Sequence, residues 1–351
     1  MENNLNKNMG TVFPEVRDEV GVVLPLEFPD CKGLRLCASR AKSFDQSKEI
    51  DWLAVQVCPK VLRLVSRVNG KIFVGSGLHQ NEEWIKISCN YTRSIFLSSA
   101  KLRFFHPWLR PVVQYFVPEL RQRKIREEGG DYKKPNDAIE WLRDLVPEPD
   151  KNDPHFHGIS QLGIGAVSEI SSVLEESGGQ WTLESMVKLK KLDSFIQETL
   201  RYSGDLTATF QRKALRPITL SDGTQTPCGT FTFSPANAIG FDPNIYPEAN
   251  IFDGLRFYNL RQASLEDENK YQLTSVTNTQ MQSGAGRHSC PVRWFASHQI
   301  KLVLAAVVDR YELRPKDGER RPKSFLFQTN QLPDPKAKIL FKRNKKRGIN
   351  G

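Results

Sequence analysis

The residues whose types and spacing point most directly to chemistry lie over 283–295, where the sequence reads SGAGRHSCPVRWF. Cys290 stands behind two glycines and the basic pair Arg287–His288. A cysteine thiolate is an established ligand of haem iron, and glycines let the backbone pass close to a flat macrocycle. The pattern therefore predicts that Cys290 binds a haem iron. It also predicts that Arg287 and His288 meet the haem propionates through charge-assisted hydrogen bonds.

The residue after the cysteine predicts how the thiolate is stabilised. Pro291 suits the first position of a helix, where its missing N–H costs no hydrogen bond, and the apolar run that follows predicts a helix over 291–311. Cys290 would then lie at the helix N-terminus, whose partial positive charge favours thiolate over thiol. The alternative for a single cysteine is a small buried hydrophobe, and the Gly-x-Gly-Arg-His-x-Cys-Pro context favours the ligand. The side chains expected to face inward are Phe295, Ile300, Val303, Leu304 and Val307.

A second pattern pairs opposite charges on a helix. Glu198 and Arg201 are three positions apart and share one face of a helix expected over 181–202. Within this segment, Ser194-x-x-Gln197 has the form of a capping box and predicts a helix start at Ser194. The alternative is an exposed ion pair that contributes only a few tenths of a kcal/mol.

Three ordered motifs together resemble the cytochrome P450 family. Residues 283–295 resemble its haem-binding loop, 193–201 (DSFIQETLR) its Glu-x-x-Arg helix, and 252–257 (FDGLRF) the segment whose arginine completes an ion-pair triad. The resemblance implies a mainly α fold with small β-sheets and an axial Cys290 thiolate. It also implies a structural triad of Glu198, Arg201 and Arg256 beneath the haem. Removing one partner from such a buried network leaves the others uncompensated, at about 3–5 kcal/mol.

The resemblance runs from about Thr11 to the C-terminus. It looks closest to the fungal secondary-metabolite monooxygenases, including ent-kaurene-oxidase-like enzymes. The supporting stretches are 70–75 (GKIFVG), 81–84 (NEEW), 108–111 (WLRP) and 333–340 (PDPKAKIL).

The loop departs from the family pattern at two positions. Ser283 stands where the family has an aromatic residue, and Val292 stands where it has a glycine two residues after the cysteine. A serine beside the thiolate raises the local polarity, which is expected to shift the redox potential of a bound iron. The β-branched Val292 occupies space that the family leaves for the macrocycle or for close helix packing.

Two family segments are expected to be missing. The first family-like stretch, 11–20, resembles sequence downstream of the membrane anchor, the β-rich lobe and a helix that clamps one propionate. Residues 157–166 resemble the start of the long helix that crosses the distal face of the haem. Glu169 already resembles the segment before the Glu-x-x-Arg helix, so several turns are expected to be lost after Ala166. Ser168 and Glu169 are interpreted as junction residues on a solvated face.

Composition limits the classes of protein that the chain can belong to. Its 351 residues, with 39% hydrophobic and 26% charged, are typical of a globular protein with a sizeable core. No apolar run reaches the roughly 18 residues of a membrane span. Residues 1–4 have neither the basic start nor the apolar stretch of a signal peptide, so none is expected. The expected location is therefore cytoplasmic or peripheral to the endoplasmic reticulum.

The cysteines, histidines and basic residues indicate no further cofactor. The six cysteines form no Cys-x-x-Cys pair, and the six histidines show no metal-ligand spacing. The formal net charge is +10, with basic clusters over 121–126 and 342–347. These clusters lack interleaved aromatics, so we expect no nucleic-acid binding. A basic surface suits the docking of an acidic electron-donor protein.

Periodicity divides the chain into a helical part and a short β-rich part. Helical spacing of apolar residues from Leu53 to Val68 predicts a core-facing helix, and a further helix is expected over 135–145. Residues 207–235 read as a small β-sheet region with a hairpin turn at Asp222–Gly223, and 325–341 as a terminal hairpin. We expect a disordered polar N-terminus over 1–10, one truncated P450-like domain over 11–341, and a basic tail over 342–351.

The sequence thus predicts a haem-thiolate monooxygenase that oxidises an apolar secondary metabolite, such as a terpenoid, polyketide or alkaloid. By resemblance, electrons would come from NADPH through a cytochrome P450 reductase, and no catalytic side chain is assigned. The alternatives are a catalytically inactive relic that lost its distal helix, and a haem-binding protein that keeps Cys290 without activating oxygen.

Overall fold

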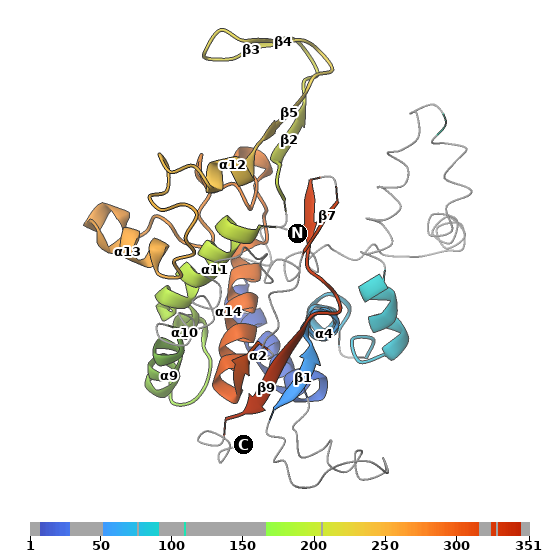
Figure 1. Cartoon of the computed structure of the whole chain (residues 1–351). Coiled ribbons are helices and arrows are strands. Elements are labelled where there is room, and N and C mark those ends of the chain that lie inside the picture. Colours follow the sequence, from blue (N-terminus) through green and yellow to red (C-terminus); the bar gives the residue numbers. More distant parts are fainter. Residues whose placement is uncertain are drawn as a thin grey trace.

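The computed structural model describes residues 8–28, 52–75, 77–90, 109, 166–204, 206–315, 324–327 and 329–344. Helices dominate these residues, as the sequence predicts (Figure 1). One helix, which is not labelled in Figure 1, covers 82–90. The labelled helices are α2 (Met9–Glu27), α4 (Val57–Val74), α9 (Val167–Glu176), α10 (Leu183–Lys188), α11 (Lys190–Ser203), α12 (Ala236–Gly240), α13 (Arg256–Gln262) and α14 (Arg293–Arg310), with 3₁₀ turns η3 (Leu265–Asp267) and η4 (Gly286–His288).

The described strands form four small antiparallel sheets. β1 (Leu53–Gln56), β9 (Lys338–Arg343) and β6 (Tyr311–Arg314) make a three-stranded sheet with β9 in the centre. The register pairs Val55 with Ile339 and Leu313 with Phe341. The two-stranded sheets are β2 (Thr209–Lys213) with β5 (Phe231–Ser234), β3 (Ile218–Thr219) with β4 (Gln225–Thr226), and β7 (Phe325–Phe327) with β8 (Asn330–Leu332).

One large hydrophobic core is built around α14. This helix contacts α2, α9 and α10, and its inward face carries the buried side chains of Phe295, Ile300, Val303 and Val307. The predicted inward residues of this helix are thus confirmed, with Leu304 partly buried against the same core. α4 packs on α2, and α13 packs on α11. Because α14 follows the cysteine segment directly, the core fixes where that segment can lie.

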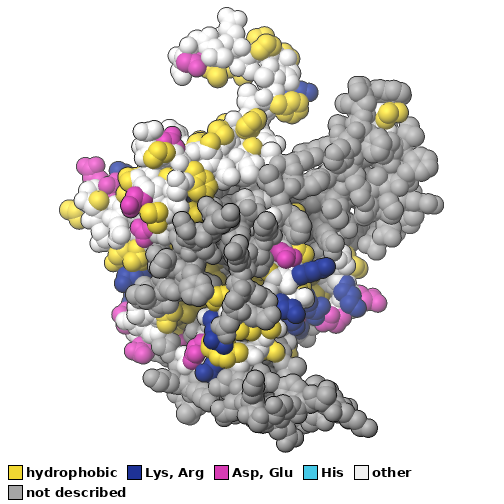
Figure 2. All heavy atoms as spheres, in the orientation of Figure 1, with side chains coloured by type: hydrophobic (Ala, Val, Ile, Leu, Met, Phe, Trp, Pro, Cys, Tyr) yellow, Lys and Arg dark blue, Asp and Glu magenta, His cyan; other side chains and the backbone are white. Residues whose placement is uncertain are grey.

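A hairpin arm projects from this core (Figure 1). β2 and β5 form its base and β3 and β4 its tip, where the predicted turn is confirmed: Gly223 adopts φ +86° and the Thr224 N–H donates to the Asp222 carboxylate at 2.9 Å. Apolar side chains gather along the arm on the surface (Figure 2), including Phe231 and Phe233.

Several predicted elements begin or end elsewhere. Leu53 lies in β1, so the helix expected to include it begins only at Val57. The expected helix over 181–202 is interrupted at Leu189, which separates α10 from α11. The expected terminal hairpin over 325–341 is the β7–β8 hairpin followed by β9, which pairs with β1 and β6 instead.

The predicted capping box at Ser194 is wrong. Ser194 lies inside α11. Its hydroxyl accepts a hydrogen bond of 2.9 Å from the N–H of Tyr258, a residue in the first turn of α13. A capping box does occur earlier, where Thr182 and Ser185 exchange side-chain and backbone hydrogen bonds at the start of α10. A tertiary partner therefore uses the hydroxyl that the local pattern had assigned to a cap.

The expected boundaries at both ends fall inside elements. Met9 is buried as the first residue of α2, and β9 continues to Arg343. Residues 1–7 and 345–351 lie outside the described residues, as do 157–165, the basic cluster over 121–126 and the helix expected over 135–145. Among the described residues, no helix is long and apolar enough to cross a membrane.

Candidate functional site

The cysteine lies at the end of a closed backbone turn. The Cys290 N–H donates to the Ser283 carbonyl at 2.7 Å, which joins the two ends of the loop. The Ser289 N–H donates to the Gly286 carbonyl at 3.0 Å within the loop, and the Gly284 N–H donates to the Met281 carbonyl at 2.9 Å just before it. Cys290 is half-buried and forms no disulfide. The loop therefore presents a single thiol on a defined backbone.

The two glycines serve different purposes in this turn. Both adopt a left-handed backbone, with φ +73° at Gly284 and +61° at Gly286. A Cβ atom on Gly284 would lie 3.3 Å from the His288 carbonyl oxygen, so the loop closes tightly there. A Cβ on Gly286 would meet nothing within 4 Å, so this glycine answers a conformational need and leaves open space beside the chain.

The helix after the cysteine begins later than the sequence predicts. α14 starts at Arg293 with Val292 as its N-cap, so Pro291 precedes the helix and is not its first residue. Cys290 is therefore not within the helix N-terminus itself. Val292 has φ −94° and ψ 12°, in the bridge region that residues with a side chain can adopt, so the backbone at this position does not require glycine.

An arginine that the sequence analysis left unassigned lies next to the cysteine. The Arg293 guanidinium donates to the Cys290 carbonyl at 2.8 Å and to the Thr274 carbonyl at 3.1 Å. Burial lowers the pKa of Arg293, and the neighbouring Cys290 opposes this effect. Since a cation beside a cysteine favours the thiolate, Arg293 supplies part of the positive charge expected from the helix end.

The predicted propionate partners lie on the same turn. Arg287 and His288 belong to η4, and both side chains are exposed. Their position, two and three residues before the cysteine, leaves them accessible to a ligand that approaches the loop. Their contact with propionates stays a prediction.

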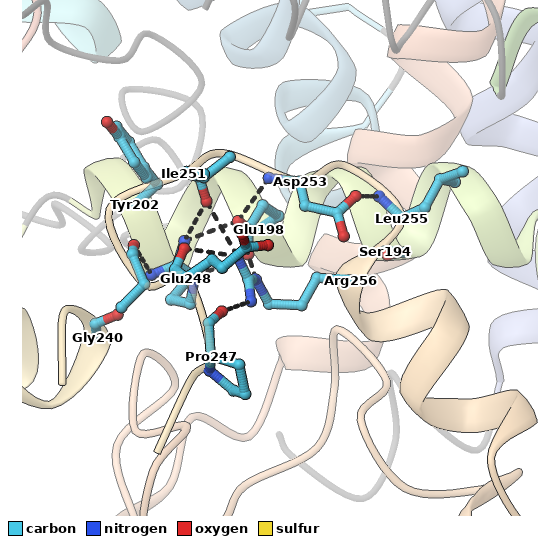
Figure 3. Close-up of polar contacts among 12 residues, drawn as sticks. Ser194, Glu198, Tyr202, Gly240, Pro247, Glu248, Ile251, Asp253, Leu255 and Arg256 are labelled. Carbon is cyan, nitrogen blue, oxygen red and sulfur yellow. Dashed lines mark hydrogen bonds and ion pairs between the residues drawn. The ribbon is translucent and has the colours of Figure 1, made fainter. Parts of the chain in front are cut away.

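The predicted triad is assembled as an ionic network between α11 and the segment 240–256 (Figure 3). The Glu198 carboxylate is fully buried and binds the Arg201 guanidinium in bidentate fashion, with both N–O distances at 2.7 Å. Arg256 Nε contacts Glu198 Oε1 at 3.3 Å, and the Asp253 N–H donates to the same oxygen at 2.9 Å. The exposed-pair alternative is thus excluded by the burial of the network.

The two arginines then fasten an irregular loop through its carbonyl groups. Arg201 donates to the carbonyls of Gly240, Ala249 and Ile251. Arg256 donates to those of Pro247 at 2.6 Å, Glu248 at 3.2 Å and Ile251 at 3.0 Å (Figure 3). The network therefore ties the segment 240–256 to α11.

A glycine and a strained residue show how tightly this loop is held. A Cβ on Gly240 would lie 3.0 Å from the Arg201 backbone oxygen, so a larger residue would push α12 away from α11. Glu248 adopts φ +53°, a left-handed conformation that non-glycine residues rarely take. Such strain persists only where the surroundings fix the backbone, as the carbonyl contacts of Arg256 do here.

A second buried ionic network, which the sequence analysis did not predict, joins α11, α13 and α14. The Asp193 carboxylate contacts Lys301 Nζ on one oxygen and Arg261 Nη1 on the other, the latter at 3.3 Å. The same carboxylate accepts the Leu273 N–H at 2.9 Å. All three charged side chains are buried. The polar stripe of α11 therefore faces the protein interior through both Asp193 and Glu198.

Glu169 corrects a further expectation. It does not lie on an ordinary solvated face: from α9, its carboxylate accepts the N–H groups of Lys191 at 2.8 Å and Leu192 at 3.0 Å and so caps α11. Burial raises the pKa of the Glu169 carboxyl, and these backbone donors partly offset the effect. The residues directly after Ala166 thus already position the helix that carries Glu198.

His298 of α14 provides a pH-dependent prediction. Burial, reinforced by the nearby Lys301 cation, lowers its pKa from 6.5 to about 4. The unfolded chain therefore binds a proton between pH 6.5 and pH 4 that the folded chain does not, so unfolding becomes easier as pH falls through this window. As pH falls from 6.5 to 4, the free energy of unfolding of the native chain, measured in urea, should drop by up to about 3 kcal/mol more than that of a His298→Gln variant. Parallel pH profiles for the two proteins would contradict the expectation.

Comparison with known proteins identifies the family. The model of the cytochrome P450 family matches residues 166–341, the part that contains the triad and the cysteine turn. The cytochrome P450 monooxygenase braC of Annulohypoxylon truncatum is 31% identical over 388 residues, which cover 97% of this chain and 73% of that protein. The chain therefore belongs to the cytochrome P450 family, and its class is that of the P450-type monooxygenases.

Further relatives come from other fungi. The monooxygenase BOA4 of Botryotinia fuckeliana is 34% identical over 340 residues, covering 84% of this chain and 68% of that protein. The cytochrome P450 monooxygenase AN1598 of Emericella nidulans is 32% identical over 339 residues, covering 84% of this chain and 63% of that protein. Among solved structures, cyanobacterial CYP120A1 with bound retinoic acid superimposes on this chain with a TM-score of 0.54 at 15% sequence identity. The match covers 96% of this chain and 76% of the CYP120A1 chain, which shows that the fold is shared.

The alignment with braC also contains residues without a counterpart here. It extends over 388 residues, whereas this chain has 351, so the relative carries segments that this chain lacks. The difference in length does not place these segments in the relative, and the loss expected after Ala166 stays a prediction.

The residues present fit a haem bound through a thiolate. The donor is one half-buried cysteine outside any disulfide, on a turn whose glycine leaves open space, with a cation on its carbonyl side. One sulfur ligand completed by a macrocycle is the arrangement that this donor set suits.

Proposed function

We propose that this chain is a haem-thiolate monooxygenase in which Cys290 binds the iron. The observation that carries the proposal is the closed turn that presents Cys290 directly before α14, in a chain that belongs to the cytochrome P450 family. When bound, a haem with a thiolate ligand supplies oxygen activation, since the thiolate pushes electron density that favours O–O cleavage.

The residues of the chain would hold and orient this group. Cys290 would supply the axial sulfur, and Arg287 and His288 would contact the propionates. Arg293 holds the cysteine from its carbonyl side and would contribute positive charge near the sulfur. The polar Ser283, buried at the base of the turn, would tune the iron through the environment of the sulfur.

The proposed substrate is an apolar secondary metabolite of terpenoid, polyketide or alkaloid type. The relatives that support this are fungal cytochrome P450 monooxygenases. We further propose that electrons come from NADPH through a cytochrome P450 reductase. The formal net charge of +10 would steer an acidic donor protein towards the chain. The proposed location is the cytoplasm or the surface of the endoplasmic reticulum.

A second candidate is a catalytically inactive or non-oxygenating haem protein. It is favoured by the residues that braC carries and this chain lacks, and by Glu169, which already caps α11 three residues after Ala166. If the missing residues are those that cover the distal face, a bound haem would be open to water and would release reduced oxygen instead of product.

Turnover in a reconstituted system separates these candidates. The purified chain, supplied with haem, NADPH and a fungal P450 reductase, is incubated with a panel of apolar terpenoids, polyketides and alkaloids. A product heavier by one oxygen atom, labelled from ¹⁸O₂ and absent without the reductase, is the expected result. NADPH oxidation that yields only hydrogen peroxide would favour the second candidate and contradict the first.

A further inference from the structure

The 272–275 turn links the second buried network to the cysteine. The Ser275 N–H donates to the Gln272 carbonyl at 2.8 Å, and the Gln272 N–H donates to the Ser275 hydroxyl at 3.0 Å, so the turn is closed in both directions. Leu273 and Thr274 are its two central residues. Each makes one strong contact outside the turn, and these two contacts lead in opposite directions.

On one side, the turn is anchored to α11. The Leu273 N–H donates to Asp193 Oδ2 at 2.9 Å, and this carboxylate is itself fixed by Lys301 of α14 and Arg261 of α13. Lys301 also donates to the Met186 carbonyl at 3.3 Å, and Arg261 to the Glu268 carbonyl at 3.3 Å. A carboxylate with two buried cations has little freedom to move, so the Leu273 N–H is held in place.

On the other side, the turn holds the cysteine. The Thr274 carbonyl accepts Arg293 Nε at 3.1 Å, and the same guanidinium donates to the Cys290 carbonyl at 2.8 Å. The planar fork of the arginine fixes the relative position of these two carbonyl groups. The contacts thus run without a gap from Asp193 through the 272–275 turn and Arg293 to Cys290.

We propose that Asp193 is a positioning residue for the iron ligand: through the 272–275 turn and Arg293, its carboxylate sets the place of the Cys290 backbone. The role of Cys290 as the iron ligand rests on the proposed function, whereas the anchoring of the 272–275 turn by Asp193 does not. The network of Glu198 fastens the 240–256 loop, and the network of Asp193 fastens the cysteine turn, so α11 positions both segments with separate carboxylates.

Hydrogen–deuterium exchange on the haem-free chain tests this placement. Asp193→Asn keeps the size of the side chain but cannot bind both cations. The amides of Leu273 and Cys290, whose acceptors are Asp193 and Ser283, are expected to exchange at least about tenfold faster, with α9 and α2 unchanged. Native exchange at Cys290, or an equal acceleration throughout the chain, would overturn the proposal.

Glu169→Gln is the matched control. Like Asp193, the native Glu169 carboxylate accepts backbone N–H groups, but these belong to Lys191 and Leu192 of α11 and not to the 272–275 turn. This variant should weaken the start of α11 and leave Cys290 exchange at its native rate. Acceleration at Cys290 equal to that in Asp193→Asn would show a general loss of stability and overturn the specific role.

Arg293→Gln tests the connection from its other end at a partly exposed position, and serves if Asp193→Asn does not fold. Cys290 exchange should accelerate about tenfold while Leu273 stays native; unchanged Cys290 exchange would overturn the proposal. In the double variant, Asp193→Asn should add nothing to the Cys290 effect of Arg293→Gln, whereas independent sites would add fully.

The haem-bound form gives a separate readout. After haem addition, the fraction of carbon monoxide complex with the thiolate-type absorption should fall in both variants and stay native in Glu169→Gln. Local exchange changes without any haem uptake by the native chain would refute the proposed function and leave the positioning role intact. If the native chain shows the thiolate-type absorption and both variants show it to the same extent, the proposed function stands and the positioning role of Asp193 is refuted.

Discussion

Replacement of Glu198 by alanine is expected to lower the free energy of unfolding by about 3–5 kcal/mol, because it leaves two arginines without their buried counter-charge. Arg201 would lose both of its contacts with a carboxylate, and Arg256 its only carboxylate within the described network. The segment 240–256, which both arginines hold by its carbonyl groups, should loosen at the same time. Urea unfolding followed by tryptophan fluorescence measures the loss, and limited proteolysis of this segment reports the loosening.

Glu176→Ala is the matched control for this experiment. Glu176 pairs with Lys188 at 3.0 Å, but both side chains are more than half exposed. An exposed pair contributes about 0–1 kcal/mol, so the control should remain close to the native stability. Similar losses for the two variants would mean that burial of the Glu198 network is not what makes it important.

Cys290→Ala is expected to weaken haem binding by at least about 100-fold, because it removes the sulfur ligand itself and even supporting residues of metal sites affect affinity by 10–100-fold. The fold should persist, since the Cys290 amide can still donate to Ser283. Titration of haem into the haem-free chain, followed by quenching of tryptophan fluorescence, measures the affinity.

Cys228→Ala provides the comparison for this titration. Cys228 is an exposed cysteine within the hairpin arm, between β4 and β5, where its sulfur contacts the Leu215 carbonyl. Its removal should leave haem affinity unchanged, whereas equal affinity in the Cys290→Ala and native chains would exclude Cys290 as the ligand.

The family, the mainly α class and the triad were predictable because they depend on short motifs. Glu198, Arg201 and Arg256 carry a recognisable spacing, and the Asp222–Gly223 turn needs only two residues to specify it. The inward face of α14 followed from apolar periodicity. The narrower branch, the substrate class and the propionate contacts of Arg287 and His288 stay predictions.

The buried polar stripe of α11 was not predictable in the same way. Asp193, Ser194 and Gln197 recur at helical spacing and have the pattern of a solvated face, yet all three are buried. Their partners come from segments distant in the sequence, such as Tyr258 for Ser194 and Lys301 for Asp193. Local spacing cannot show such partners. The signal available in the sequence was Lys301, a lysine within the apolar run of α14.

Local patterns also misplaced the ends of elements. The apolar spacing from Leu53 onward continues across the change from strand to helix, because β1 and α4 both direct apolar residues into the same core. Pro291 suggested a helix start that the turn around Cys290 delays to Arg293. In both places the tertiary contacts, and not the local preferences, decide where the helix begins.

The most direct test of the central claim is the carbon monoxide difference spectrum of the haem-loaded, reduced native chain. A red-shifted Soret band of the thiolate type, lost in Cys290→Ala and retained in Cys228→Ala, is the predicted result. A Soret band at the position of a haem without a thiolate ligand, or no Soret band, would contradict the assignment of Cys290 as the iron ligand.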